Sequence, residues 1–212
     1  MDDRKIIKNK NRNRKNFNKK AARYFETIDG KYSLLMYGEV IDRINRRSFS
    51  SILDVGCGPG AMLARILNHH AEAEAFGLDL SDRMIEKADK SLNGRAVFKV
   101  GDADSLPWSE NSFDILVCNA SFHHYPEPYK VLNEMKRVLK PNGWLVMADP
   151  WWTAILRSII NLYCKTPFNL EGDYHIYSQK EIVDLLVNCG YVNIEFENPI
   201  GKYYIVSAAV YK

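Results

Sequence analysis

Short apolar runs alternate with amphipathic stretches through the middle of the chain. The runs predict buried strands, and the stretches between them carry apolar residues at helical spacing. Strands that alternate with helices favour a parallel, doubly wound sheet with right-handed crossovers. The predicted strands are residues 51–55, 73–78, 96–100, 113–118 and 144–148, and the predicted helices between them are 61–68, 83–92 and one that ends at 139.

The pattern changes at both ends of this alternating core. Two amphipathic segments before the first strand predict helices that cover the sheet or its ligand. After the fifth strand, two further helices lead to two strands joined by a short turn, which predicts an antiparallel pair. We therefore predict an α/β fold with a Rossmann-like, doubly wound, seven-stranded sheet: five parallel strands plus a C-terminal antiparallel β-hairpin, with N-terminal cover helices and a helical lid after strand five. These end segments are helices 17–28, 32–46, 153–165 and 179–189, and strands 193–197 and 203–211.

The length of 212 residues is most simply one large domain with a substantial core. Residues 1–23 hold ten Lys and Arg against two Asp, whereas the rest of the chain is net negative. A segment this polar cannot bury enough apolar area to offset the entropy of ordering it, so we expect residues 1–15 to be dispensable for folding and ligand binding. The predicted division is a basic, disordered arm at 1–16 and a single domain at 17–212, made of cover helices 17–48, a cofactor-binding core 51–149, a lid insertion 150–177, and a helix with a β-hairpin at 178–212.

Charge and cysteine content limit the function classes. A basic arm can bind nucleic acid or an anionic surface, although no aromatic stacking residue interleaves the charges before Phe17. The cysteines are scattered without a C-x-x-C pair, so we expect no disulfide scaffold, no metal site and a reducing, cytoplasmic location. No apolar run approaches the length of a membrane span, and we expect no signal peptide. The cysteines are Cys57, Cys118, Cys164 and Cys189.

The candidate ligand site begins where the first strand ends. Segment 51–60 runs from a buried strand through three glycines into a helix. Glycines let a ligand approach the main chain, and the free N–H groups of the helix favour a negative group. The second strand ends near Asp79, whose carboxylate can accept both hydroxyls of a ribose. Gly56, Gly58 and Ala61 also satisfy the dinucleotide pattern G-x-G-x-x-G/A, so this motif alone leaves a dinucleotide and another adenosine-bearing ligand open.

Five ordered segments together resemble the motifs of one family. Residues 53–60 match, residue for residue, the first motif of the class I S-adenosylmethionine-dependent methyltransferases, in the small-molecule group similar to the ubiquinone/menaquinone biosynthesis methyltransferases. The resemblance runs from about Phe17 to the C-terminus. A C-terminal β-hairpin is not the second half of a dinucleotide-binding dehydrogenase, which weighs against NAD. The other matching segments are 77–81, 101–108, 113–114 and 133–143.

The resemblance implies that S-adenosyl-L-methionine is the cofactor. In the family's arrangement, Asp79 would take the ribose hydroxyls, and Asp102 with the backbone of Ala103 would recognise the adenine. Asn119 would lie under the methionine part, and Asp54 would order the loop more than it contacts the ligand. The implied cofactor-binding residues are Asp54, Gly56, Cys57, Gly58, Gly60, Asp79, Leu80, Asp102, Ala103 and Asn119.

Methyl transfer from an activated sulfonium mainly requires alignment of the acceptor and exclusion of water. A general base is needed only if the acceptor must lose a proton. His123 and His124 follow the fourth strand and have a suitable side chain for that role, although a packing role for the pair stays open. Tyr24 in the first cover helix could approach the sulfonium or the acceptor. The candidate catalytic residues are His123, His124 and Tyr24.

Aromatic side chains crowd the segment after the fifth strand. Such density suits a lid over an apolar or aromatic acceptor, and it suits a plain hydrophobic cluster or a dimer contact equally well. No charged cluster marks an anionic substrate there. The candidate acceptor-binding residues are Tyr24, His124, Trp151, Trp152 and Tyr177.

The predicted function is therefore methyl transfer to a small, apolar or aromatic acceptor by in-line displacement, in a monomer or a homodimer. Two alternatives stay open: an RNA or protein methyltransferase that uses the basic arm, and a non-catalytic S-adenosylmethionine-binding regulator. Residues 119–122 carry no Asn/Asp-Pro-Pro-Tyr type of acceptor motif, which weighs against nucleic acid as a partner.

Overall fold

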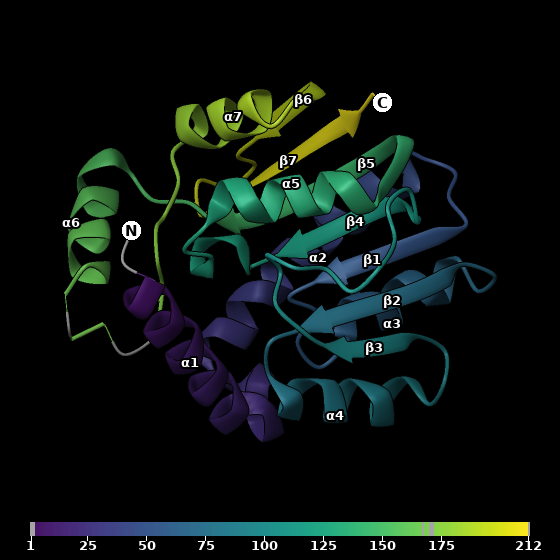
Figure 1. Ribbon diagram of the computed structural model, residues 1–212, viewed down its shortest axis with the longest axis horizontal. Coiled ribbons are helices and arrows are strands. Elements are labelled where there is room, and N and C mark those ends of the chain that lie inside the picture. Colours follow the sequence, from purple (N-terminus) through teal and green to yellow (C-terminus); the bar gives the residue numbers. More distant parts are fainter. Residues whose placement is uncertain (1–2, 167, 170–171, 212) are drawn as a thin grey trace.

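Seven strands form one mixed sheet in the order β3-β2-β1-β4-β5-β7-β6 (Figure 1). The computed structural model describes residues 3–166, 168–169 and 172–211. β1 to β5 are mutually parallel, and β7 runs antiparallel to both β5 and β6. The predicted fold class, including the C-terminal hairpin, is confirmed. The strands are β1 Ser51–Val55, β2 Glu74–Asp79, β3 Val97–Val100, β4 Phe113–Asn119, β5 Leu139–Pro150, β6 Tyr191–Glu197 and β7 Tyr203–Val210.

Helices cover both faces of the sheet, with α5 and α7 on one face and α2 and α3 on the other (Figure 1). The central strand β4 shows why, because successive side chains of a strand point to opposite faces. Leu116 packs into the α5–α7 side of the core and Val117 into the α2–α3 side, and both are fully buried. The helices are α1 Asp3–Lys20, η1 Ala21–Glu26, α2 Ile28–Asn45, α3 Ala61–His69, α4 Asp82–Leu92, η2 Phe122–His124, α5 Pro128–Val138, α6 Ala154–Cys164 and α7 Gln179–Asn188.

The sequence predicted a disordered arm at residues 1–16, but the described residues from Asp3 onwards form α1, Asp3–Lys20, and residues 1–2 lie outside the described part of the chain. Composition alone gives this segment little apolar area to bury, but tertiary ion pairs supply the missing stabilisation. Lys10 contacts Asp102 and Asp104, and Arg14 contacts Asp82. The basic residues of one helix face therefore meet acidic residues from the rest of the chain.

The turn predicted at residues 140–143 lies inside β5 instead of before it. Phe113 pairs with Leu139 and Ile115 pairs with Trp144, so four residues of β5 bulge out without ending the strand. Asn142 takes a left-handed conformation at φ 61°, which asparagine tolerates. No helix among the described residues is long and apolar enough to cross a membrane.

Candidate functional site

A first pocket lies at the carboxyl ends of the parallel strands, beneath α1 and η1. The empty space of this pocket is about 730 Å³ when the open solvent at its mouth is counted with it. Its walls come from the loops that follow β1, β2, β3 and β4, which meet at one edge of the sheet. The lining residues are Lys10, Asn13, Arg14, Phe17, Tyr24, Gly56, Gly58, Leu78, Asp79, Leu80, Ser81, Met84, Gly101, Asp102, Ala103, Asn119, Ala120, Ser121, His124, Tyr125 and Pro126.

Two glycines of the loop after β1 differ in the space around them. Gly56 has φ 77°, and a Cβ on it would lie 2.0 Å from the Ser121 hydroxyl oxygen. Gly58 has φ 52°, and a Cβ there would approach only a Tyr24 ring carbon, at 4.0 Å. The first glycine is therefore required for packing, and the second leaves its backbone open to the first pocket.

Two carboxylates stand behind the glycine loop: Asp54 is buried, and Asp79 is partly buried and lines the first pocket. Asp79 accepts hydrogen bonds from the Gly58 and Ser81 backbone N–H groups at 2.9 and 2.8 Å, yet burial raises its pKa to about 6. Burial, helped by the charge of Asp79, raises the pKa of Asp54 to about 8. Oδ1 of Asp54 has no hydrogen-bond partner in the described part of the chain. These carboxylates are held in place with incomplete compensation for their lost hydration.

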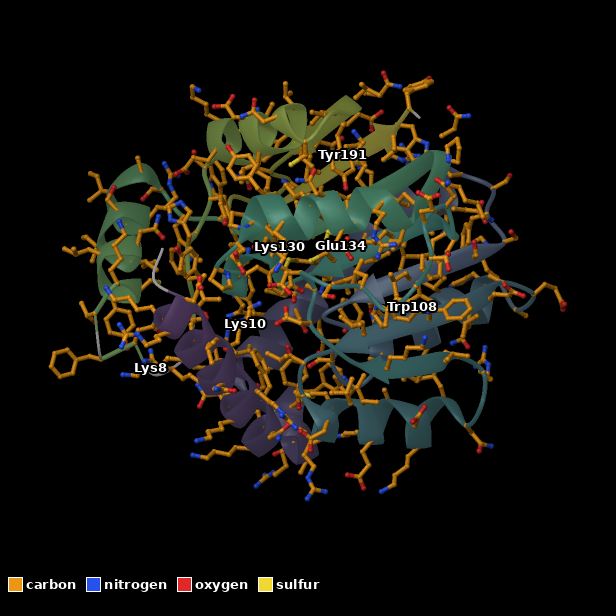
Figure 2. The ribbon with its side chains drawn as sticks, viewed as in Figure 1. Lys8, Lys10, Trp108, Lys130, Glu134 and Tyr191 are labelled. Carbon is orange, nitrogen blue, oxygen red and sulfur yellow. The ribbon has the colours of Figure 1, made fainter. Side chains whose placement is uncertain are left out.

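A lysine from α1 reaches the loop after β3. Lys10 Nζ lies 2.8 Å from the Asp102 carboxylate and also bonds Asp104, which Lys130 of α5 approaches at 3.4 Å (Figure 2). Burial opposes the charge of Lys10, but the two carboxylates raise its pKa overall. Beside Asp102, the first pocket is therefore bordered by ion pairs that Lys10 of α1 and Lys130 of α5 make with acidic residues of the loop after β3.

Seven of the ten residues predicted to bind the cofactor line this pocket: Gly56, Gly58, Asp79, Leu80, Asp102, Ala103 and Asn119. Asp54, Cys57 and Gly60 do not line it. Asp54 and Cys57 are buried below the loop, and Gly60 packs closely against Leu92 and Ala88. The prediction missed the α1 wall, although Lys10, Asn13, Arg14 and Phe17 have the i, i+3, i+4, i+7 spacing of one helix face.

A second pocket adjoins the first, and Phe17, Tyr24, Ala120 and His124 line both. Of the predicted acceptor-binding residues, Tyr24, His124 and Trp152 line this second pocket. Its walls are mainly aromatic and aliphatic, with two carboxylates. The other lining residues are Ile28, Asp29, Tyr32, His123, Pro150, Ile160, Tyr163, Asp173 and Ile176.

Trp151 and Tyr177 line neither of these two pockets. The Trp151 ring packs against Phe196 of β6, with 5.9 Å between ring centroids. Tyr177 is buried in the core with its ring 5.1 Å from that of Phe122. Both tryptophans follow the end of β5, but Trp151 packs against β6 whereas Trp152 lines the second pocket.

The adjacent histidines have opposite electrostatic environments. His123 Nδ1 lies 2.8 Å from an oxygen of Asp149, whose other oxygen accepts the His123 backbone N–H at 2.8 Å. Burial disfavours the charge, but Asp149 raises the pKa of His123 to about 9. Burial and the neighbouring His123 lower the pKa of His124. Near neutral pH, His123 is therefore a charged imidazolium, and His124 is a neutral imidazole.

Asp173 completes this cluster from the segment that follows α6. Its Oδ1 lies 3.7 Å from His123 Nε2 and 3.2 Å from His124 Nδ1. One ligand atom from each of the three side chains lies within 4.8 Å of the others, so the cluster has the donor set to hold a metal ion. The scattered cysteines had predicted no metal site, and this donor set has no sequence signal because Asp173 is far from the histidines along the chain.

Comparisons with known proteins agree on one family. Residues 53–147 match the family model described as a methyltransferase domain. Demethylmenaquinone methyltransferase of Thermotoga maritima is 35% identical over 179 residues, which is 75% of this chain and 77% of that protein.

Solved structures show the same fold. The YcgJ protein of Bacillus subtilis superposes with a TM-score of 0.68 at 19% identity, over 83% of this chain and 98% of that one. Phosphoethanolamine N-methyltransferase 2 of Haemonchus contortus, solved with S-adenosyl-L-methionine, gives a TM-score of 0.69 at 15% identity. That match covers 92% of this chain and 60% of the other.

Proposed function

This chain belongs to the class I S-adenosylmethionine-dependent methyltransferases, and we propose that it methylates a small, apolar or aromatic acceptor held in the second pocket. The observation that carries the proposal is the wall shared by the two pockets. Tyr24 and His124 belong to both, so a cofactor in the first pocket and an acceptor in the second would meet across these side chains.

The residues of the first pocket fit the cofactor chemically. When bound, S-adenosylmethionine supplies a methyl group on a sulfonium that is already activated. The uncompensated Asp79 carboxylate would gain hydrogen bonds from ribose hydroxyls, and Asp102 would accept from the adenine amine. The buried amide oxygen of Asn119 has no partner within the described ranges and would face the methionine part.

The second pocket suits a small acceptor with an apolar body. Trp152, Ile160 and Tyr163 provide apolar surface on the lid side, and Tyr32 and Ile28 provide it from α2. Enclosure between these two segments would exclude water and hold the acceptor atom in line with the methyl group.

The two histidines would divide the handling of a proton. His123 already carries one between Asp149 and Asp173, so it would position Asp173 instead of acting as a base. His124 is neutral and lines both pockets, and its Nδ1 faces Asp173. If His124 took the proton of a phenol-like acceptor, it would become an imidazolium next to the Asp173 carboxylate. That carboxylate would offset part of the repulsion from protonated His123.

The same proposal extends to the cellular location of the protein. Cys57, Cys118 and Cys189 are free thiols buried in the fold, which suits a reducing compartment such as the cytoplasm. We propose no partner for the methyl transfer itself beyond the acceptor.

The test is methyl transfer from labelled S-adenosylmethionine to a panel of phenols, hydroquinones and amines. We expect His124→Ala to lower turnover by roughly 10²–10⁴-fold and leave S-adenosylhomocysteine affinity nearly unchanged. His175→Ala is the matched control, because that imidazole pairs with Glu181 outside both pockets. Turnover unchanged in His124→Ala would remove the base role, and methylation of RNA or protein but of no small acceptor would refute the proposed substrate class.

A further inference from the structure

α6 leaves most of its large apolar residues exposed, whereas an ordinary surface helix buries them. None of its residues is buried. The half-buried side includes Arg157 and Asn161, which bond to backbone groups: Arg157 to the Trp152 carbonyl at 3.2 Å, and Asn161 to both the N–H and the carbonyl of Ile176. Ile160 and Cys164 complete the half-buried side, so the inward contacts of α6 leave its exposed aliphatic residues unexplained.

The outward side of α6 is a stripe of large aliphatic residues. Ile155, Ile159 and Leu162 are 76%, 60% and 69% exposed, and their i, i+4, i+7 spacing places them on one face. A protein that only meets water rarely keeps such a contiguous apolar patch exposed. Other exposed apolar side chains extend the stripe: Trp152, Leu156, Tyr163 and Phe168.

A basic face adjoins this stripe. The Asn9 side chain donates to the Gly172 carbonyl and Arg12 donates to the Asn169 carbonyl, which ties α1 to the segment after α6. Lys8, Lys15 and Lys19 share the exposed side of α1. Figure 2 shows Lys8 reaching from α1 on the side of the molecule where α6 stands.

We propose that the exposed faces of α6 and α1 together dock the protein on an anionic membrane surface. The α6 stripe would lie in the boundary between head groups and acyl chains, and Lys8, Lys15 and Lys19 would meet the lipid phosphates. α6 lies on the bilayer in this arrangement and does not span it.

Charge decides between this occupant and the others. A second copy placed symmetrically on the same surface could pair the two apolar stripes, but it would offer no anionic group to either basic α1 face, because a two-fold interface repeats the same patch. Nucleic acid would satisfy the lysines but leave the apolar stripe in water. An anionic bilayer is the partner that complements both faces at once.

Docking would also orient the second pocket, since Ile160 and Tyr163 of α6 line it. An acceptor that partitions into the bilayer could then reach the pocket from the membrane side. Only this last consequence rests on the proposed function; the docking itself does not.

The experiment is flotation of the full-length protein with vesicles of phosphatidylcholine alone or mixed with phosphatidylglycerol. We expect binding to the anionic vesicles that weakens with salt. The triple variant Ile155→Gln/Ile159→Gln/Leu162→Gln and the triple variant Lys8→Glu/Lys15→Glu/Lys19→Glu should each lower the partition coefficient at least about tenfold. Val187→Gln on α7 and Lys90→Glu on α4 are controls, because both side chains are exposed on helices that are not part of the proposed surface.

Three outcomes would overturn the proposal. The first is no binding to anionic vesicles, or equal loss in the control variants. The second is a dimer in analytical ultracentrifugation that the α6 variant dissociates while vesicle binding is absent. The third is RNA binding that the α1 variant abolishes while vesicle binding is absent. Thermal melts of each variant separate these results from unfolding, and the exposed positions make unfolding a minor effect.

Discussion

The two ends of the parallel strands use the same residue type in opposite ways. At the carboxyl ends, Asp54 is buried, Asp79 is half-buried, and the pKa values of both are raised. At the amino ends, Asp114 accepts hydrogen bonds from the backbone and hydroxyl groups of Ser50 and Ser51, at 2.8–3.0 Å. One carboxylate is satisfied by the fold, whereas the other two have polar capacity left over.

The energetic consequence differs in sign between the two edges. Partial burial opposes ionisation of Asp114, but Lys140 at 2.9 Å and the serine donors hold its pKa well below its usual range. This ionised group stabilises the fold. The carboxylates at the other edge cost stability when ionised, which is expected of groups kept for a ligand. The same residue type therefore stabilises the fold at the amino-terminal edge of the sheet and keeps unused hydrogen-bonding capacity beside the first pocket at the carboxyl-terminal edge.

The largest expected effect tests the binding edge. Gly56→Ala would place a Cβ 2.0 Å from the Ser121 hydroxyl in a left-handed backbone, so we expect at least about 100-fold weaker S-adenosylhomocysteine binding by calorimetry and a loss of about 3 kcal/mol in the free energy of unfolding. Gly201→Ala has the same backbone sign and open space around it, so it isolates the backbone strain of about 1–2 kcal/mol. Equal effects of the two substitutions would contradict the packing role of Gly56.

The next effect tests the stabilising edge. Asp114→Ala removes the acceptor for two serines and one lysine, so the free energy of unfolding should fall by about 2–3 kcal/mol in urea titrations. Cofactor affinity should stay within about twofold, because the residue is at the opposite edge. A large loss of cofactor affinity without a loss of stability would contradict the stabilising role of Asp114.

Asp79→Ala should do the reverse. We expect S-adenosylhomocysteine to bind more weakly by about 1–3 kcal/mol, the cost of leaving the ribose hydroxyls without their acceptor. The stability of the free protein should change little or rise. Asp184→Ala on the exposed face of α7 is the control. An unchanged affinity would remove Asp79 from the ribose role.

A smaller effect concerns α1. Deleting residues 1–16 removes Lys10, Asn13 and Arg14 from the wall of the first pocket, so cofactor affinity should fall by about tenfold, the equivalent of about 1.4 kcal/mol. The melting temperature should fall by only a few degrees, since the main core lies elsewhere. Unchanged affinity would restore the sequence-based prediction that this segment is dispensable for binding.

The smallest effect is a difference in pH dependence. A raised folded-state pKa means that Asp54 favours the fold at low pH, and this contribution is lost as pH rises from about 4 to about 8. A lowered folded-state pKa means that Asp114 stabilises the fold above about pH 4, and that this stabilisation is lost as pH falls further. Urea unfolding at several pH values should therefore show that Asp54→Asn reduces the decline towards pH 8 by about 1–2 kcal/mol, and that Asp114→Asn reduces the decline towards acid. The same sign for both variants would contradict the contrast between the edges.

The sequence predicted the sheet well, and a pocket lies at the edge where it placed the cofactor, because both depend on local signals. Buried strands are recognisable in the sequence as apolar runs. The glycine loop and Asp79 follow or end parallel strands, whose carboxyl ends meet at one edge of the sheet. The boundaries of β5 differed because Asn142 allows a bulge where a turn residue usually ends pairing.

The rest depends on contacts between distant segments, which no local pattern contains. α1 is ordered by ion pairs such as Lys10–Asp102, so its own composition indicated disorder. Asp173 joins the histidines only through the path of the chain after α6. Aromatic density correctly marked Trp152 as a pocket residue but could not separate it from Trp151, which packs against β6.

The most direct test of the account is a crystal structure with S-adenosylhomocysteine bound. We predict the ribose at Asp79, the adenine at Asp102 and Ala103, and the sulfur directed at the wall formed by Tyr24 and His124, with the second pocket beyond it. A ligand bound at the carboxyl-terminal edge with its sulfur directed away from that wall, or bound at another edge of the sheet, would contradict the account.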